Sequence, residues 1–146
     1  MHKNKFCDCV KLNGEEQVNV IRYCANTHKE VVGLSMQETL KEVETWVERM
    51  GKDYPKLAGP FMIWLRRVEE KGALDTKTKE LISIALSVAT QCKWCIALHT
   101  KNALEAGSTK DEIMEACFVA CLFRGGPACM YAQLAMNCID ECKQTT

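Results

Sequence analysis

The sequence predicts an all-helical protein with about six helices in one domain. Apolar residues recur at three- and four-residue steps, helix start and stop residues punctuate the chain, and the alternation typical of strands is almost absent. The chain has 146 residues, of which 47% are hydrophobic and 26% are charged. It is therefore long and apolar enough to form its own core.

Start and stop signals delimit the expected helices. Each begins at a capping residue or a proline and ends close to a glycine or a turn. The helices are expected from Met36 to Gly51, from Pro60 to Gly72, from a cap at Asp75 to about Thr90, from near Cys92 to Gly107, from a cap at Ser108 or Thr109 onward, and from the Gly125-Gly126-Pro127 turn to about Cys142. Because the connections are short, consecutive helices should pack as neighbours.

The chain divides into an N-terminal extension, residues 1–34, and a helical domain, residues 35–146. Lysine plus arginine balances aspartate plus glutamate at 19 each, so the charge does not favour nucleic acid or an anionic membrane as a partner. The start is not followed by an apolar run of signal-peptide length, and no apolar stretch approaches the ~20 residues needed to span a bilayer. We therefore expect a cytoplasmic protein.

Ten cysteines are the unusual feature of the composition. In a reducing compartment they stay free, and a buried packing role is the default for a free cysteine. Cys92-Lys93-Trp94-Cys95, followed four residues later by His99, stands out because these thiols and the imidazole should share one face of a helix. A dithiol beside a proton acceptor is typical of a redox site.

Four residues have the spacing of a known redox motif: Glu80, then eleven residues, then Cys92-x-x-Cys95-x-x-x-His99. The pattern resembles that of the alkylhydroperoxidase D-like (AhpD-like) branch of the carboxymuconolactone decarboxylase family. Residues 74–81 and 106–113 resemble helix starts of the same family, and the likeness covers roughly residues 36–142. The resemblance implies an AhpD-like orthogonal helical bundle that assembles as homo-oligomers, either trimers or hexamers.

The resemblance also implies a thiol-disulfide oxidoreductase that reduces disulfides, hydroperoxides or both, a peroxiredoxin-type activity. It makes Cys95 the attacking thiol, Cys92 the resolving thiol, and Glu80 with His99 a proton relay. This chemistry requires a hydroperoxide or disulfide substrate and an electron donor that the sequence does not identify, but no cofactor. A lactone decarboxylase, the alternative within the family, would gain nothing from two vicinal thiols.

The position of Glu80 requires a break in the chain. In one continuous helix Glu80 would lie roughly 18 Å from Cys92 along the axis, too far for its carboxylate to act. We therefore expect a break near Thr90-Gln91 that folds the two segments back on each other. Such a break would place both cysteines in the first turn of a new helix, where the helix dipole favours a thiolate.

Two residues depart from the peroxidase pattern, in which a histidine lies between the cysteines. Here those positions are Lys93 and Trp94. A lysine can lower the pKa of a thiol through its charge, but it does not shuttle protons near neutral pH unless it is strongly desolvated. The substitution weakens the expectation of peroxidase activity more than that of dithiol exchange.

The other cysteines allow a different function, that of a metal- or iron–sulfur-binding electron-transfer protein, because two sets of ligands could bind zinc or an iron–sulfur cluster. An N-terminal set consists of Cys7, Cys9, Cys24 and His28. A C-terminal set consists of Cys117, Cys121, Cys138 and Cys142. Neither set has the spacing of a familiar zinc module, and the C-terminal four are otherwise expected to be small core residues.

Overall fold

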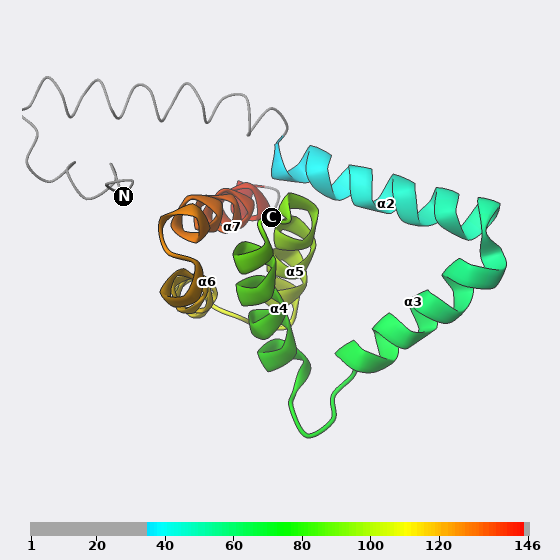
Figure 1. The fold of residues 1–146 in the computed structure, drawn as a ribbon, viewed down its shortest axis with the longest axis horizontal. Helices are drawn as coiled ribbons and strands as arrows, with labels where there is room; N and C mark the ends of the chain where they lie inside the picture. The colour runs from blue at the N-terminus through cyan, green and yellow to red at the C-terminus, as the bar shows by residue number, and fades with distance from the viewer. Residues whose placement is uncertain (1–34, 145–146) are drawn as a thin grey trace, which may run out of the picture. The chain divides into compact units, whose positions relative to one another are not determined.

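The computed structural model describes residues 35–144, and every regular element in this range is an α-helix (Figure 1). The helices are α2 (Met36–Asp53), α3 (Pro55–Glu69), α4 (Thr76–Thr90), α5 (Lys93–Glu105), α6 (Lys110–Arg124) and α7 (Gly126–Gln144). The all-helical prediction is confirmed. None of these helices is long and apolar enough to cross a membrane. The N-terminal extension, residues 1–34, lies outside the described residues.

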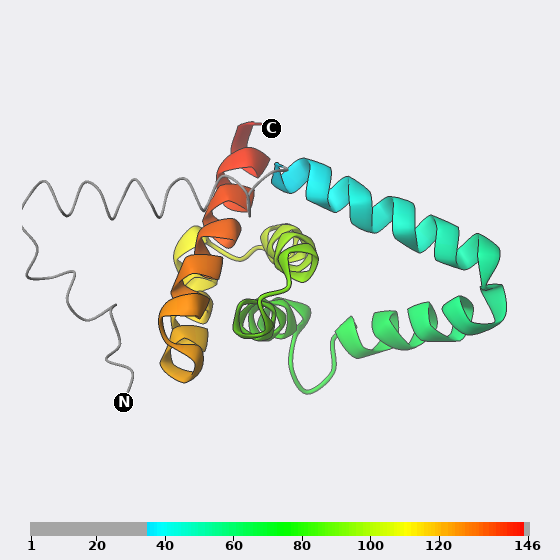
Figure 2. The same cartoon turned by 45° about the horizontal axis from the view of Figure 1, so that its top comes forward.

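Helices α4, α5, α6 and α7 enclose the core. Helix α4 packs against α5 and α6, and α7 packs against the same two helices and also contacts α4 (Figure 2). The core is aliphatic, and its largest fully buried apolar side chains are Ile84, Val88, Ile96, Ile113 and Ile139. Buried alanines lie between them and let the helix backbones approach closely: Ala97, Ala103, Ala120, Ala128, Ala132 and Ala135.

Helix α2 packs on α5 and α7 and is tied to α7 at its N-terminus. The backbone N–H groups of Met36 and Gln37 donate to the two carboxylate oxygens of Glu141, over 3.1 and 3.0 Å. These are two of the N–H groups that a helix start leaves unpaired, and a carboxylate also complements the helix dipole there. No local sequence signal indicates this cap, because 105 residues separate Met36 from Glu141.

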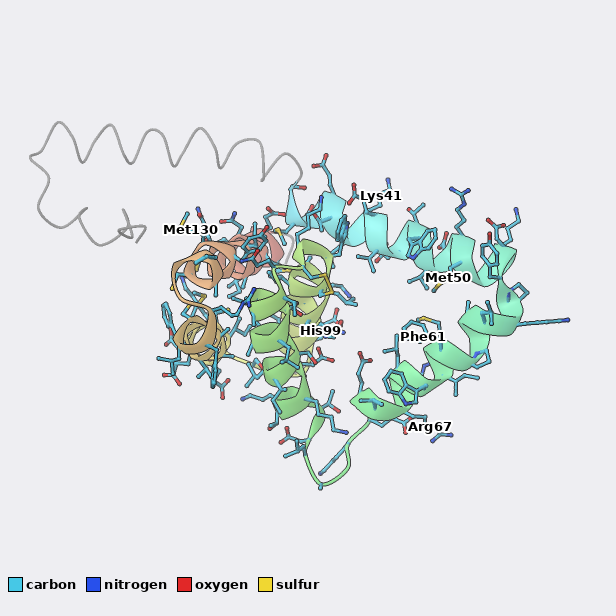
Figure 3. All side chains as sticks on the ribbon, viewed as in Figure 1. Lys41, Met50, Phe61, Arg67, His99 and Met130 are labelled. Atoms are coloured by element: carbon cyan, nitrogen blue, oxygen red, sulfur yellow. A yellow bond between two sulfur atoms is a disulfide. The ribbon has the colours of Figure 1, made fainter. Side chains whose placement is uncertain are left out.

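Beyond its first turns, α2 leads away from the core and α3 returns towards α4, so that many side chains of this pair have no packing partner within residues 35–144 (Figure 3). Large apolar side chains that are about half exposed or more form what we call the α2–α3 surface: Trp46, Tyr54, Leu57, Phe61, Ile63, Trp64 and Val68. Large apolar side chains exposed in such number on one pair of helices are typical of an interaction surface.

Two helix starts differ from the prediction. Helix α3 begins at Pro55, and Pro60, the predicted start, lies inside it. Both prolines could open a helix, because the first helical position needs no N–H, and the upstream one does so. Pro60 leaves the carbonyl of Lys56 without its helical N–H partner but does not end the helix. Helix α7 begins at Gly126, so only Gly125, with φ of 63°, forms the break.

The caps predicted for α4 and α6 are confirmed. The Asp75 carboxylate accepts the backbone N–H of Thr78 at 2.7 Å. Thr109 and Glu112 form a reciprocal capping box, in which the Glu112 carboxylate accepts the Thr109 N–H at 2.8 Å and the Thr109 hydroxyl accepts the Glu112 N–H at 3.2 Å. These caps fix where both helices start.

Candidate active site

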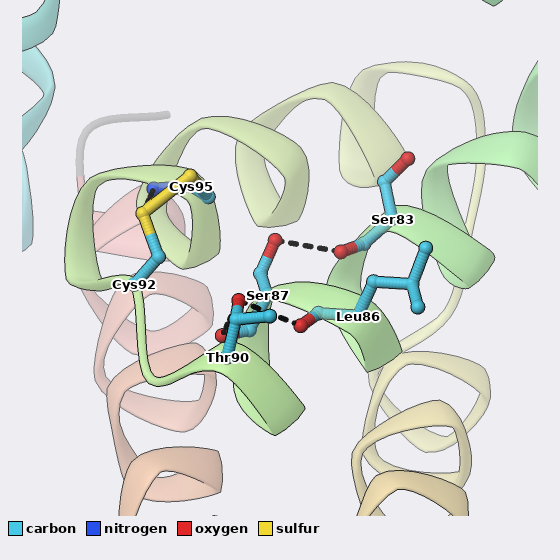
Figure 4. Close-up of a disulfide and its surroundings, with 6 residues drawn as sticks. All are labelled: Ser83, Leu86, Ser87, Thr90, Cys92 and Cys95. Atoms are coloured by element: carbon cyan, nitrogen blue, oxygen red, sulfur yellow. Dashed lines mark hydrogen bonds between the residues drawn. A yellow bond between two sulfur atoms is a disulfide. The ribbon is translucent and has the colours of Figure 1, made fainter.

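The predicted break between Glu80 and the cysteines is confirmed. Helix α4 ends at Thr90, and Gln91 adopts the left-handed conformation, with φ of 60° and ψ of 36° (Figure 4). The N–H of Cys92 then donates to the carbonyl of Ser87 at 3.0 Å, which satisfies one of the unpaired carbonyls at the helix end. Helix α5 starts at Lys93, two residues after Gln91, and runs back along α4.

Cys92 and Cys95 form a disulfide at the start of α5, with their Cα atoms 5.4 Å apart (Figure 4). Cys92 is the N-cap residue of α5, and its Sγ accepts the backbone N–H of Cys95 at 3.3 Å. Both cysteines are half-buried. Because the N-terminus of a helix favours negative charge, this position favours negative charge on the Cys92 sulfur.

The break brings Glu80 and His99 into direct contact. His99 Nδ1 lies 2.7 Å from Glu80 Oε2, and the two side chains are 18% and 3% exposed, respectively. With Glu80 ionised, the Nδ1–H group donates to the carboxylate and leaves Nε2 able to accept a proton. His99 follows Cys95 by four residues on α5, so the two side chains lie on one face of this helix.

Glu69, which the sequence analysis did not single out, joins this pair. One side-chain oxygen or nitrogen atom from each of Glu69, Glu80 and His99 lies within 4.8 Å of the others. Burial raises the pKa of the Glu69 carboxyl, the negative charge of Glu80 raises it further, and His99 partly opposes both. Glu69 is the last residue of α3 and belongs to a run of charged residues that is typical of a solvent-exposed helix face. No sequence signal therefore indicated a role in the site.

The same three residues are also the kind of donors that bind a divalent cation. Two ligands of one cation at metal–ligand distances near 2.1 Å lie about 3 Å or more from each other. The Nδ1–Oε2 separation of 2.7 Å is instead that of a direct hydrogen bond. As placed in this structure, the pair is therefore arranged for acid–base chemistry.

Lys93 and Trp94, the residues between the cysteines, both contact Glu42 on α2. The Trp94 Nε1–H group donates to Glu42 Oε2 at 2.7 Å, and Lys93 Nζ lies 3.7 Å from the same oxygen and 4.7 Å from the centre of the Trp94 ring. These contacts tie the dithiol segment to α2. Beside them is a hollow of about 460 Å³ lined by Glu42, Val43, Trp46 and Trp94.

Of the remaining described cysteines, Cys117 and Cys138 are buried in the core, Cys121 and Cys142 are half-buried, and Cys129 is exposed. Burial is the main reason that the pKa is raised to about 12 at Cys117 and at Cys138, and to about 11 at Cys121. Among residues 35–144, no three cysteine sulfur atoms come close enough to share a metal ion, so the predicted C-terminal set is not assembled as a metal site. The N-terminal candidates Cys7, Cys9, Cys24 and His28 lie outside the described residues.

The fold and the site together define an all-helical protein with a vicinal dithiol beside a buried carboxylate–imidazole pair. The model of the carboxymuconolactone decarboxylase family matches residues 55–137, more than half of the chain. The chain therefore belongs to the carboxymuconolactone decarboxylase family, as its resemblance at the sequence level implied.

Three relatives illustrate this membership. Uncharacterized protein 4 in the cox locus of Paracoccus denitrificans is 43% identical over 81 residues, which are 56% of this chain and 73% of that protein. The nitrosuccinic acid decarboxylase of Metarhizium robertsii is 26% identical over 106 residues, 73% of this chain and 71% of the relative. The crystal structure of a carboxymuconolactone decarboxylase family protein from Legionella pneumophila is 35% identical and superposes with a TM-score of 0.70, over 73% of this chain and 95% of that one.

Proposed function

We propose that this protein is a thiol-disulfide oxidoreductase that reduces disulfides, hydroperoxides or both through the Cys92–Cys95 pair. One observation carries the proposal: the disulfide caps the start of α5, and His99, one turn further along the same helix, is hydrogen-bonded to the buried Glu80 carboxylate of α4. A dithiol supplies two electrons, and the neighbouring pair can accept and return the protons that accompany them.

In the oxidative half of the cycle, Cys95 is the nucleophile. His99 accepts its proton, and the thiolate attacks a hydroperoxide, so that a sulfur–oxygen bond forms, the oxygen–oxygen bond breaks and the leaving alkoxide takes the proton. Cys92 then attacks the sulfenic sulfur, the disulfide forms, and water leaves. With a disulfide substrate, Cys95 forms a mixed disulfide and Cys92 expels the second substrate thiol.

The reductive half requires a donor dithiol. The donor attacks the Cys95 sulfur, and Cys92 leaves as a thiolate. The N-cap position of Cys92 supports this assignment, because the hydrogen bond from the Cys95 N–H and the helix dipole both stabilise negative charge on the leaving sulfur. The donor disulfide forms when its second thiol displaces Cys95.

The residues between the cysteines favour disulfides over hydroperoxides as substrates. Peroxidase members of the family carry a histidine there, whereas this chain has Lys93 and Trp94. The charge of Lys93 is partly neutralised by Glu42, 3.7 Å away. His99 and Glu80 are then the groups left near the dithiol that can move protons at neutral pH.

We also propose that the active form is a homo-oligomer, a trimer or a hexamer. Besides the α2–α3 surface, α4 and α6 expose a second set of large apolar side chains, which we call the α4–α6 surface: Ile82, Leu86, Phe118, Val119, Leu122 and Phe123. Two different apolar surfaces on one chain suit a head-to-tail contact, which closes into a ring when the rotation allows.

A second candidate function is decarboxylation of a small acid. The relative from Metarhizium robertsii is named a nitrosuccinic acid decarboxylase, and the Glu80–His99 pair is an acid–base pair that does not depend on the cysteines. This reaction would leave the vicinal thiols without a role. Release of carbon dioxide from dicarboxylic acids, unchanged when both cysteines are replaced, would favour it.

A single-turnover experiment tests the proposal. Fully reduced protein is mixed anaerobically with one equivalent of cumene hydroperoxide or of a model disulfide, small molecules are removed, and the remaining protein thiols are counted. Wild type should lose two thiols per chain, and so should the matched control Cys129→Ser, which removes an exposed free cysteine. The double variant Cys92→Ser/Cys95→Ser should lose none on the same timescale, and an equal loss there would refute the proposal.

A further inference from the structure

The end of α3 is fixed against the start of α4 by three hydrogen bonds. The hydroxyl of Thr76 donates to the carbonyl of Glu69 at 3.2 Å. The ammonium group of Lys79 donates to the carbonyls of Val68 and Glu70, at 2.7 and 2.6 Å. These are carbonyls that the end of a helix leaves unpaired, and satisfying them fixes the backbone on both sides of Glu69.

This anchoring places the Glu69 carboxyl beside Glu80. Thr76, which holds the Glu69 backbone, precedes Glu80 by one turn on the same face of α4. The carboxyl oxygens of Glu69 and Glu80 and a ring nitrogen of His99 accordingly lie within 4.8 Å of one another. The Glu80 side chain is only 3% exposed, whereas Glu69 is half-buried and reaches solvent.

The neighbouring cations Lys79 and Arg67 are bound to other groups, so the carboxyls of Glu69 and Glu80 and the imidazole of His99 interact mainly with each other. On α4, Lys79 is bound to backbone carbonyls, and at the end of α3 Arg67 pairs with Glu70 at 3.3 Å. Within the described residues, no cation pairs with the Glu69 carboxylate; Glu80 and His99 are the charged groups that act on it. Two neighbouring carboxyls in a shielded site tend to share a proton, because both cannot ionise without repulsion.

We infer that Glu69 is the outer member of a three-residue proton relay, Glu69–Glu80–His99, and that it exchanges protons between the buried Glu80 carboxyl and solvent. The inference rests on the proposed dithiol chemistry. When Cys95 loses its proton to His99, the Nδ1 proton can pass to Glu80 and from Glu80, directly or through one bridging water, to Glu69; when a leaving group needs a proton, the transfers run in reverse. Only protons move in these steps. Glu69 touches neither sulfur and is a positioning residue that acts through Glu80.

The test compares Glu69→Gln with Glu70→Gln, a matched control whose side chain forms a surface pair with Arg67. The rate of dithiol oxidation by a model disulfide is measured in single turnovers from pH 5 to pH 9, with EDTA present. Glu69→Gln should be roughly tenfold slower at neutral pH, less than the ~10²-fold loss of a group that transfers the proton directly. Added formate or acetate should restore much of its rate, and Glu70→Gln should match wild type.

Several outcomes would overturn the inference. One is a Glu69→Gln rate equal to that of wild type. Another is a slower Glu69→Gln rate with an unchanged pH profile and no rescue by formate or acetate, which would indicate a structural role. Tight binding of zinc or manganese that Glu69→Gln abolishes, with activity lost in EDTA, would make the cluster a metal site instead. An active wild type with an unaffected variant overturns this inference alone, whereas a wild type that does not oxidise its dithiol overturns the proposed function as well.

Discussion

His99 Nδ1 lies 2.7 Å from Glu80 Oε2, although the two residues are 19 positions apart and on different helices. The contact exists because the chain reverses between Thr90 and Cys92, so that α5 runs back along α4. A buried carboxylate that orients an imidazole sets both its tautomer and its basicity. The proton chemistry of the dithiol therefore depends on the reversal as much as on the four residues of the motif.

Removal of either member of this pair should slow the dithiol without destroying it. His99→Ala should raise the pH at which Cys95 reacts with iodoacetamide towards the unperturbed cysteine value of about 8.5. Glu80→Gln should slow turnover by roughly 10²-fold, the lower end of general acid–base effects. Alkylation rates followed by peptide mass spectrometry and a pH–rate profile measure both effects. Unchanged profiles in both variants would mean that these residues are structural.

The reversal itself should be sensitive to the residue at position 91. Gln91 is the only residue other than glycine with a positive φ among the described residues. A left-handed conformation costs an ordinary residue such as Gln91 ~1–2 kcal/mol, and it costs a β-branched residue more. Gln91→Val should therefore destabilise the fold by roughly a further 1–2 kcal/mol, and Gln91→Gly should be neutral or slightly stabilising. Thermal midpoints at one fixed protein concentration measure this. Gln133→Val, on an exposed position of α7, is the matched control and should cost less than ~1 kcal/mol.

The buried thiols should make the protein sensitive to alkali. Cys117 and Cys138 have pKa values raised to about 12, whereas in the unfolded chain they titrate near 9. Between these values the folded state binds more protons than the unfolded state, so stability is retained below about pH 9 and falls as the pH rises towards 12. Cys117→Ala should reduce this fall by about 1 kcal/mol per pH unit. Urea midpoints at pH 8, 9 and 10 test it, and identical slopes in both proteins would contradict it.

The two exposed apolar surfaces should hold copies of the chain together. At micromolar concentration, wild type should sediment as a trimer or a hexamer. Leu122→Glu places a charge at an 82% exposed position of the α4–α6 surface and should shift the protein towards monomer, because a charge is costly to bury in an interface. Gln133→Glu on α7 should leave the assembly unchanged. A monomeric wild type would contradict the assembly.

The helices and the redox motif could be predicted from the sequence because both depend on local signals. Caps such as Asp75 and Thr109 are readable from neighbouring residues, and the break at Gln91 follows from the need to bring Glu80 to His99. No local rule would have found Gln91 itself, since left-handed helix ends usually carry glycine. Which of two prolines opens α3 also depends on packing, and Pro60 was the wrong choice.

The contacts that complete the site are tertiary, and they cannot be predicted from local sequence patterns. Glu42 reaches Trp94 across 52 residues, and Glu141 caps α2 across 105. Glu69 lies among charged residues that resemble any solvated helix end, and only the anchoring of α3 on α4 brings it to Glu80. Side chains of this kind become visible only when the helices are placed in space.

The central claim is that Cys95 attacks and Cys92 resolves, and a trapping experiment tests it most directly. In a Cys129→Ser background, which removes the exposed free thiol, reduced Cys92→Ser protein is mixed with a model disulfide and analysed by peptide mass spectrometry. We expect a stable mixed disulfide on Cys95 in this variant and no turnover in Cys95→Ser. Full turnover by Cys95→Ser, or an adduct found elsewhere than on Cys95, would contradict the account.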